Sequence, residues 1–142
     1  MRKLLKSFKT EIHPTPEQKC KINKTIGTCR YIYNFYLSQN KELYEKGESF
    51  LSGKSFSIWL NQEYLPRHPE KEWIKEVSSK AVKKAMEDGC TAFTRFFNHQ
   101  SGFPKFKKKE KSDVKMYFVK NNPMDCLCER HRIKIPTLGW VR

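Results

Sequence analysis

The strongest constraint on the fold of this chain is the spacing of apolar residues that follows Ser78. Apolar side chains recur there every three or four residues and form one stripe of a helix, at Val82, Ala85, Met86, Gly89, Phe93, Phe96 and Phe97. Gly89 lies on this stripe, although a glycine costs about 1 kcal/mol in a helix interior. Its position predicts that another backbone segment packs closely against the helix; the alternative is neutral drift.

Helix-start signals extend the helical region back to Thr15. Thr15 suits an N-cap, Pro16 suits the first helical position, and Gln18 completes a capping box. These signals predict a helix of about ten residues that ends near Gly27, where a glycine favours a helix end.

Two more helices are predicted between Gly27 and Ser78. Apolar spacing predicts an amphipathic helix from Cys29 to Gly47 and a shorter helix over residues 56–64, closed by Pro66 and Pro69. The chain therefore contains a helical block that occupies most of its first 100 residues.

Alternating patterns flank the helical block. Residues 4–12 place Leu4, Phe8 and Ile12 on one face, and residues 114–118 and 132–135 alternate likewise. Residues 138–142 have the character of the start of another strand. Because edge strands cannot bury themselves, we expect the first and last segments to pair with the helices inserted between them, which gives an α+β fold.

The net charge of the chain points to a polyanionic partner. Lys and Arg number 29 against 15 Asp and Glu, a formal net charge of +14. Residues 101–142 carry 11 basic and 4 acidic residues, so the last 42 residues hold half of the excess. A charge of this size is typical of nucleic-acid binding.

Several other classes of protein do not fit the sequence. No run of 18 apolar residues and no secretory signal occurs, and the five cysteines show no disulfide framework. We therefore expect a cytoplasmic protein with reduced thiols and no membrane partner.

No set of residues indicates catalysis. The four histidines are scattered, and most acidic residues fall on helices among lysines. Cys126 and Cys128 with Glu129 and His131 lack the usual zinc spacing and fit a turn better. The composition indicates a binding protein without a cofactor.

Basic residues alternate with aromatic ones in two segments, residues 30–36 and residues 103–109. Lysines neutralise phosphates, and aromatic faces stack on unpaired bases. The alternative is a core role, which we favour for Tyr33, Tyr36, Phe93, Phe96 and Phe97. A further basic set, Lys80, Lys83 and Lys84, lies opposite the apolar stripe near the start of its helix, where the helix dipole adds positive charge.

Five short motifs stand in order along the chain and carry a resemblance to a known family. They are Arg30–Asn34 (RYIYN), Trp73–Val77 (WIKEV), Ala92–Phe97 (AFTRFF), Gly102–Lys107 (GFPKFK) and Lys134–Val141 (KIPTLGWV). Together they resemble the N-terminal part of TnpB (OrfB), a transposon-encoded RNA-guided DNA nuclease related to type V CRISPR effectors.

This resemblance implies a fold and a division into domains. Residues 1–14 would begin a wedge (WED) β-barrel, residues 15–101 would form an inserted helical recognition (REC) bundle, and residues 102–142 would return to the antiparallel barrel, which is incomplete here. In the family these parts bind the guide RNA and the guide–target heteroduplex, and they read a short transposon-adjacent DNA motif.

The resemblance also assigns roles to single residues. Those that would contact DNA are Lys54, Phe56, Ser79, Lys80, Lys83, Lys120 and Asn121. Charge and location assign guide RNA to Lys105, Lys107, Lys108, Arg130 and Arg132. Some residue types differ from those of better-known members, so the DNA motif is left open.

The family's RuvC-like nuclease domain, which uses Mg²⁺, and its zinc ribbon have no counterpart in these 142 residues. We therefore expect no DNA cleavage by this chain alone, and the expected partners are guide RNA, target DNA and a separate or continuing RuvC-like segment. Two alternatives remain: a fragment of an intact nuclease, and a stand-alone helix-turn-helix regulator that binds duplex DNA without RNA.

Overall fold

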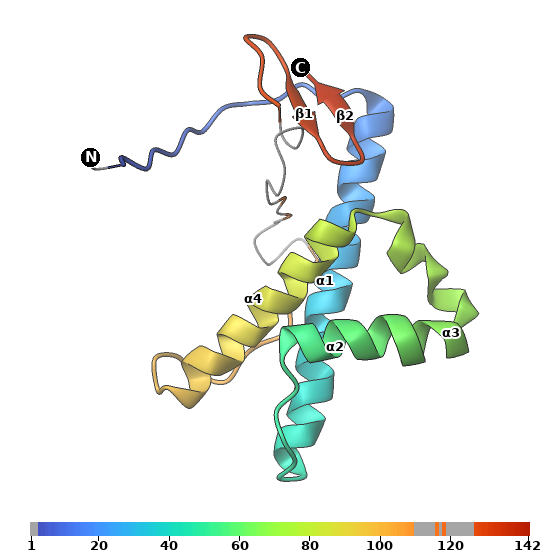
Figure 1. Ribbon diagram of the computed structural model, residues 1–142, viewed down its shortest axis with the longest axis vertical. Coiled ribbons are helices and arrows are strands. Elements are labelled where there is room, and N and C mark those ends of the chain that lie inside the picture. The colour runs from blue at the N-terminus through green and yellow to red at the C-terminus, as the bar shows by residue number, and fades with distance from the viewer. Residues whose placement is uncertain (1–2, 110–115, 117, 119–126) are drawn as a thin grey trace.

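The computed structural model describes residues 3–109, 116, 118 and 127–142, and it combines crossed helices with one small antiparallel sheet (Figure 1). The α-helices that form the core are α1 (Pro16–Glu45), α2 (Gly53–Trp59) and α4 (Ser79–Phe97). The other helical segments are the π-helical turn η1 (Leu60–Tyr64), α3 (Leu65–Arg67) and the 3-10 helix η2 (Pro69–Glu76). The strands are β1 (Ile133–Ile135) and β2 (Gly139–Val141). The α+β class is confirmed.

The first helix begins as the sequence predicts but does not end where it predicts. The Thr15 hydroxyl accepts from the backbone of Gln18, and the Gln18 side chain accepts from the backbone of Thr15, a complete capping box. The predicted break near Gly27 is wrong, because α1 continues for 30 residues. Burial of Ile32 and Tyr36 against the other helices outweighs the cost of about 1 kcal/mol for one helical glycine.

The second helical segment also passes the residue that was expected to end it. Helical structure continues from Gly53 to Arg67 through Pro66. A π-helical turn precedes the proline, in which the amide of Leu65 donates to the carbonyl of Leu60. This wider turn changes the hydrogen-bond register just before Pro66, which has no amide hydrogen to donate.

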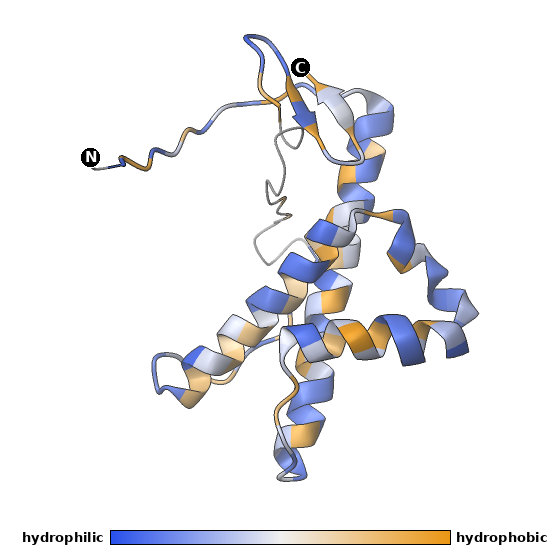
Figure 2. Cartoon of the chain, in the orientation of Figure 1, coloured by the Kyte–Doolittle hydropathy of each residue, from blue (hydrophilic) through white to orange (hydrophobic). Residues whose placement is uncertain are grey.

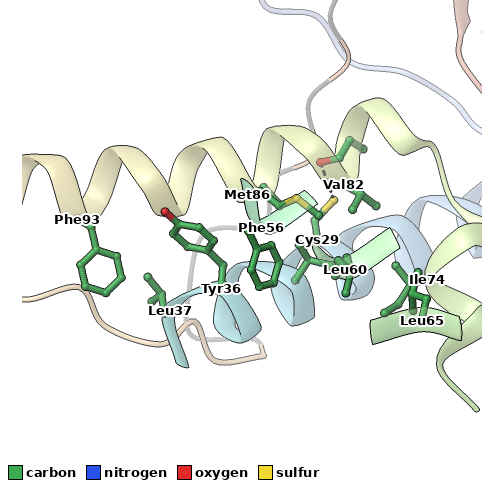
Figure 3. Close-up of a cluster of buried hydrophobic side chains, with 13 residues drawn as sticks. Cys29, Tyr36, Leu37, Phe56, Leu60, Leu65, Ile74, Val82, Met86 and Phe93 are labelled. Carbon is green, nitrogen blue, oxygen red and sulfur yellow. Dashed lines mark hydrogen bonds between the residues drawn. The ribbon is translucent and has the colours of Figure 1, made fainter. Parts of the chain in front are cut away.

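The core lies where α1, α2 and α4 meet (Figure 3). Its fully buried large side chains include Ile32 and Tyr36 of α1, Phe56 of α2 and Phe93 of α4. The close packing predicted at Gly89 is present, although the neighbour is a side chain rather than backbone. A Cβ at Gly89 would lie 2.5 Å from Cδ1 of Tyr36.

The C-terminal hairpin sits on the start of α1. Strands β1 and β2 pair antiparallel with Lys134 opposite Trp140, as the alternation at residues 132–135 predicts. The Gln18 amide donates to the carbonyls of Leu138 and Trp140 at 3.3 and 2.8 Å. The side chain of Gln18 therefore ties the hairpin to the first turn of α1.

The strand predicted at residues 4–12 is wrong. Residues 3–15 contain no regular element, and Leu4, Leu5 and Phe8 are 78%, 97% and 89% exposed. Figure 2 shows apolar and polar residues mixed along this extended arm. Only its end meets the hairpin, where the His13 amide donates to the carbonyl of Arg142. The predicted strand at residues 114–118 lies mostly outside the described residues, and Met116 and Phe118 are not in a strand.

Candidate nucleic-acid interface

Three of the residues assigned to DNA line one groove between α2 and α4, which we call the α2–α4 groove. One hollow of about 400 Å³ is lined by Lys54 and Lys83, and an adjoining hollow of about 160 Å³ is lined by Lys83 and Ser79. Met86 lies in the wall of both hollows. The fold thus brings together side chains that are more than 20 positions apart in the sequence.

The groove forms because α2 approaches α4 closely at Gly53. A Cβ at Gly53 would lie 3.4 Å from the carbonyl oxygen of Met86, which leaves little room for a larger residue. The Ser52 hydroxyl caps α2 by accepting from the amide of Ser55. Lys54, the second residue of α2, is consequently held at the rim of the groove.

The α2–α4 groove carries a net positive charge, because Lys54 and Lys83 line its larger hollow together with one carboxylate, that of Glu87. The first turn of α4 has no acidic residue, and the N-cap Ser78 makes no side-chain capping bond, so the positive end of the helix dipole is not offset there. Lys80 and Lys83 add charge to the same end of α4. Lys84 instead turns toward Asp88, with Nζ 3.6 Å from Oδ1.

The assignment of Phe56 to DNA is not supported. Its side chain is fully buried and contacts the rings of Phe35, Tyr36 and Trp59, so no face is available to a base. Lys120 and Asn121, also assigned to DNA, lie outside the described residues.

The lysines assigned to RNA lie on a segment that crosses α1 after the end of α4; we call residues 103–109 the basic strap (Figure 1). The side-chain amide of Asn34 holds the strap at one point. Its Nδ2 donates to the carbonyl of Lys107 at 2.9 Å, and its Oδ1 accepts from the Lys107 amide at 2.8 Å. The Lys107 ammonium lies 4.4 Å from the ring centre of Tyr33. Lys105 and Lys108 are exposed.

Asn34 is the residue that sequence reasoning missed. It lies within the aromatic segment 30–36, whose rings mostly serve packing: Tyr31 meets Trp73 edge-on at 5.0 Å and Phe35 lies 4.9 Å from Tyr64. A single polar residue on the half-buried face of such a segment is the signal that could have identified it.

The two arginines assigned to RNA lie on the hairpin region, apart from the strap in the sequence. Arg130 is exposed. Arg132 donates to the Glu129 carboxylate at 2.6 Å and lies 4.1 Å from the ring centre of Trp140. The hydrogen bond from Arg132 lowers the pKa of Glu129 below its usual value. The bond to Glu129 uses Nε of Arg132, so the terminal nitrogens of the guanidinium can still donate to a phosphate.

The described residues contain neither a candidate metal site nor a candidate membrane span. No three His, Cys, Asp or Glu side chains in that part of the chain gather as a metal site would require. In the same residues no helix is both long enough and apolar enough to cross a membrane.

Comparison with known proteins gives one family and several relatives. A model described as a helix-turn-helix domain, that of OrfB proteins of IS605 elements, matches residues 1–49. The described part of that range contains an extended arm and a single continuous helix, without an internal turn.

Two relatives are much longer than this chain. "Putative RNA-guided DNA endonuclease InsQ" of Escherichia coli K12 is 29% identical over 99% of this chain and 34% of its own length. "Putative RNA-guided DNA endonuclease" of Streptomyces pristinaespiralis is 26% identical over 85% of this chain and 30% of its own length. The chain therefore spans about a third of the length of these relatives. "Virulence protein VsdF" of Salmonella dublin is 32% identical over 75% of this chain and 95% of its own length.

Proposed function

We propose a function from the premise that the chain belongs to the TnpB (OrfB) family, as its domain match and its relatives show. Membership implies nucleic-acid binding. We propose more specifically that the chain holds guide RNA and the guide–target heteroduplex and reads a transposon-adjacent motif on duplex DNA. Cleavage would belong to a RuvC-like segment, either separate or continuing from this chain.

The observation that carries the DNA part of this proposal is the convergence at the α2–α4 groove. Lys54, Ser79 and Lys83 were assigned to DNA from separate sequence positions, and they line adjoining hollows at the positive end of α4. Helix N-termini and lysines bind phosphate, while a hydroxyl such as that of Ser79 can contact a base edge or a phosphate.

The RNA part of the proposal rests on the basic strap. Lys105, Lys107 and Lys108 follow closely on the strap, whose backbone the Asn34 bonds hold along α1 at Lys107. A strand of closely spaced phosphates would release counterions on binding there.

We also propose the domain division 1–14 and 102–142 as wedge strands around a recognition bundle at 15–101. The bond from His13 to Arg142 supports it, because it joins the two flanking segments, and the bonds from Gln18 hold the second segment against the start of α1. A cytoplasmic, prokaryotic location is part of the same proposal.

Paired lysine variants test this division of labour. Lys54→Ala with Lys83→Ala should weaken duplex DNA binding, lower its salt slope by about 2 and spare RNA, since each phosphate contact contributes about 0.9. Lys105→Ala with Lys107→Ala and Lys108→Ala should weaken RNA binding and spare DNA. Lys9→Ala with Lys46→Ala removes two positive charges elsewhere, as many as the Lys54 and Lys83 variant, and is the control for that variant. Equal loss of both ligands in both variants would refute the assignment.

A second candidate is the stand-alone helix-turn-helix regulator, which the description of the matching domain favours. It predicts tight duplex binding with no RNA recovered from the purified chain. Recovery of one structured transcript from beside the gene, after a high-salt wash, would exclude it in favour of the guide-RNA role.

A further inference from the structure

A separate hollow, of about 360 Å³, lies between α1 and the basic strap, and we call it the strap cleft. Its lining residues are Leu37, Lys41, Phe103, Pro104, Lys105, Phe106 and Lys108. The volume is near the lower end of the ~300–1,000 Å³ range of small-ligand sites. Lys41 had no assigned role in the sequence, and it faces this cleft from α1.

The two phenylalanines of the strap differ in their surroundings. Phe103 packs against Phe93, Phe96 and Tyr44, with ring centres 5.6, 5.0 and 5.7 Å away, and so anchors the strap to the core. Phe106 is 48% exposed. In the described part of the chain it pairs with no other ring, which leaves an aromatic face turned to the cleft.

In the described part of the chain, the charged residues that line the strap cleft are all lysines. Lys41 and Lys105 are exposed and approach the cleft from α1 and from the strap respectively. Proteins that bind single-stranded nucleic acids present exposed aromatic faces between basic residues. The base stacks on the ring, and the phosphates contact the cations. A base inside a duplex is already stacked and has no free face to offer.

The strap is also held before any ligand arrives. The two Asn34 bonds, at 2.9 and 2.8 Å, fix the strap one residue beyond Phe106, and Phe103 fixes it three residues before. A ring held on both sides loses little conformational entropy when a base stacks on it.

We propose that the strap cleft binds one unpaired nucleotide, whose base stacks on Phe106 and whose phosphates contact Lys41 and Lys105. The proposal rests on the proposed RNA-binding function of the strap, and it specifies that the bound strand is unpaired. Base and phosphate are common to RNA and DNA, so both strand types are tested below.

The test measures binding of the full chain to a ten-nucleotide single-stranded RNA, the same sequence as DNA, and an RNA hairpin stem. Phe106→Ala should weaken binding of the single strands by about 5- to 150-fold, the equivalent of ~1–3 kcal/mol per stacked base. Its salt slope should not change. Phe106→Trp should keep the affinity, and Phe106→Leu should lose it although the apolar surface is largely retained.

Lys41→Ala should lower the salt slope for the single strands by about 0.7, the value for one phosphate contact, whereas Lys9→Ala should leave it unchanged. A larger loss with RNA than with DNA would identify RNA as the strand, and the reverse would identify DNA. Equal losses for the hairpin stem and the single strands would overturn the proposal, as would competition by oligoglutamate at equal strength.

The failure of this inference can be distinguished from the failure of the proposed function. If Phe106→Ala leaves affinity within twofold while the triple lysine variant loses RNA, the nucleotide cleft is refuted and the RNA role of the strap stands. If the triple lysine variant keeps full RNA affinity, the proposed function itself is refuted. Thermal midpoints of all variants check that each one folds.

Discussion

Replacement of Asn34 by alanine tests whether one side chain holds the basic strap on α1. Asn34 spans 73 positions to make both of its bonds to the backbone of Lys107, and both are partly buried. No other residue has to move for alanine to fit, because the change only removes atoms. The variant therefore isolates the two hydrogen bonds.

The expected loss follows from three contributions. Each hydrogen bond contributes a net ~0.5–1.5 kcal/mol, so the pair contributes about 1–3 kcal/mol. Alanine returns roughly 0.6 kcal/mol because it favours a helix interior more than asparagine does. The net loss is about 0.5–2.5 kcal/mol, which lowers the melting temperature by roughly 1–10 °C at this chain length.

Asn61→Ala is the matched control. Asn61 also donates from Nδ2 to a backbone carbonyl, that of Ser57 at 2.8 Å, but the bond is exposed and spans only four residues. We expect a change within about 0.5 kcal/mol, since exposed groups regain water when the bond is lost.

Amide hydrogen exchange gives the sharper measurement. The amide of Lys107 donates to Asn34 and should be protected in the parent chain. In Asn34→Ala it should exchange at the rate of an exposed amide, and RNA affinity should fall although every lysine remains. If the Lys107 amide stays protected from exchange in Asn34→Ala, or if Asn34→Ala and Asn61→Ala have the same melting temperature, the Asn34 bonds do not hold the strap.

Two further predictions concern the core. Gly89→Ala should destabilise the chain by up to about 2 kcal/mol in denaturant unfolding, because crowding costs ~1–3 kcal/mol and the helix preference of alanine returns ~1 kcal/mol. The crowded ring is that of Tyr36, which is fully buried and donates to the carbonyl of Leu51 at 2.8 Å; Gly102→Ala, with nothing within 4 Å, should be neutral, and equal effects would contradict the packing argument. Burial raises the pKa of Cys29 to about 11, so at pH 8 an alkylating reagent should label the exposed Cys20 and Cys128 and reach Cys29 only after unfolding. Burial keeps the Cys29 thiol neutral in the folded state, so the stability that the neutral thiol contributes should be present below pH ~9 and lost as the pH rises toward 11. Labelling of native Cys29 at the rate of Cys20 would contradict the burial of Cys29.

Local signals predicted the helices because each signal acts within one turn. The capping box at Thr15 and the apolar stripe of α4 need no distant partner, and both are present in the structure. The break expected at Gly27 failed for the opposite reason. The cost of one glycine is local, but the burial that outweighs it comes from α2 and α4, which the residues around Gly27 do not reveal.

The first segment shows the corresponding limit for strands. Alternation at residues 4–12 describes what a strand would bury but not whether an edge is available. The Gln18 amide bonds the carbonyl of Leu138, in the turn before β2, and that of Trp140, in β2. These contacts span more than 100 positions, and periodicity carries no information about them.

The site was predictable only in part. The convergence of Lys54 with Ser79 and Lys83 could not be derived from spacing, because it depends on how α2 crosses α4 at Gly53. The resemblance to a family supplied those residues without their geometry. Asn34 was missed because its partner is the backbone of Lys107, which has no sequence signature.

Phe56 and Phe106 show why aromatic residues need a structural frame before they are assigned to bases. Phe56 and Leu60 are four residues apart along consecutive helical turns, a spacing that by itself places Phe56 on a buried face, and the structure buries both completely. The family resemblance had assigned Phe56 to DNA against that local signal. Phe106 lies on an irregular segment that has no period, so its exposure of 48% follows only from where Phe103 and Asn34 hold the strap. The position of an aromatic residue on a helix can therefore exclude it from base stacking, but only tertiary contacts can show that an aromatic residue is available to a base.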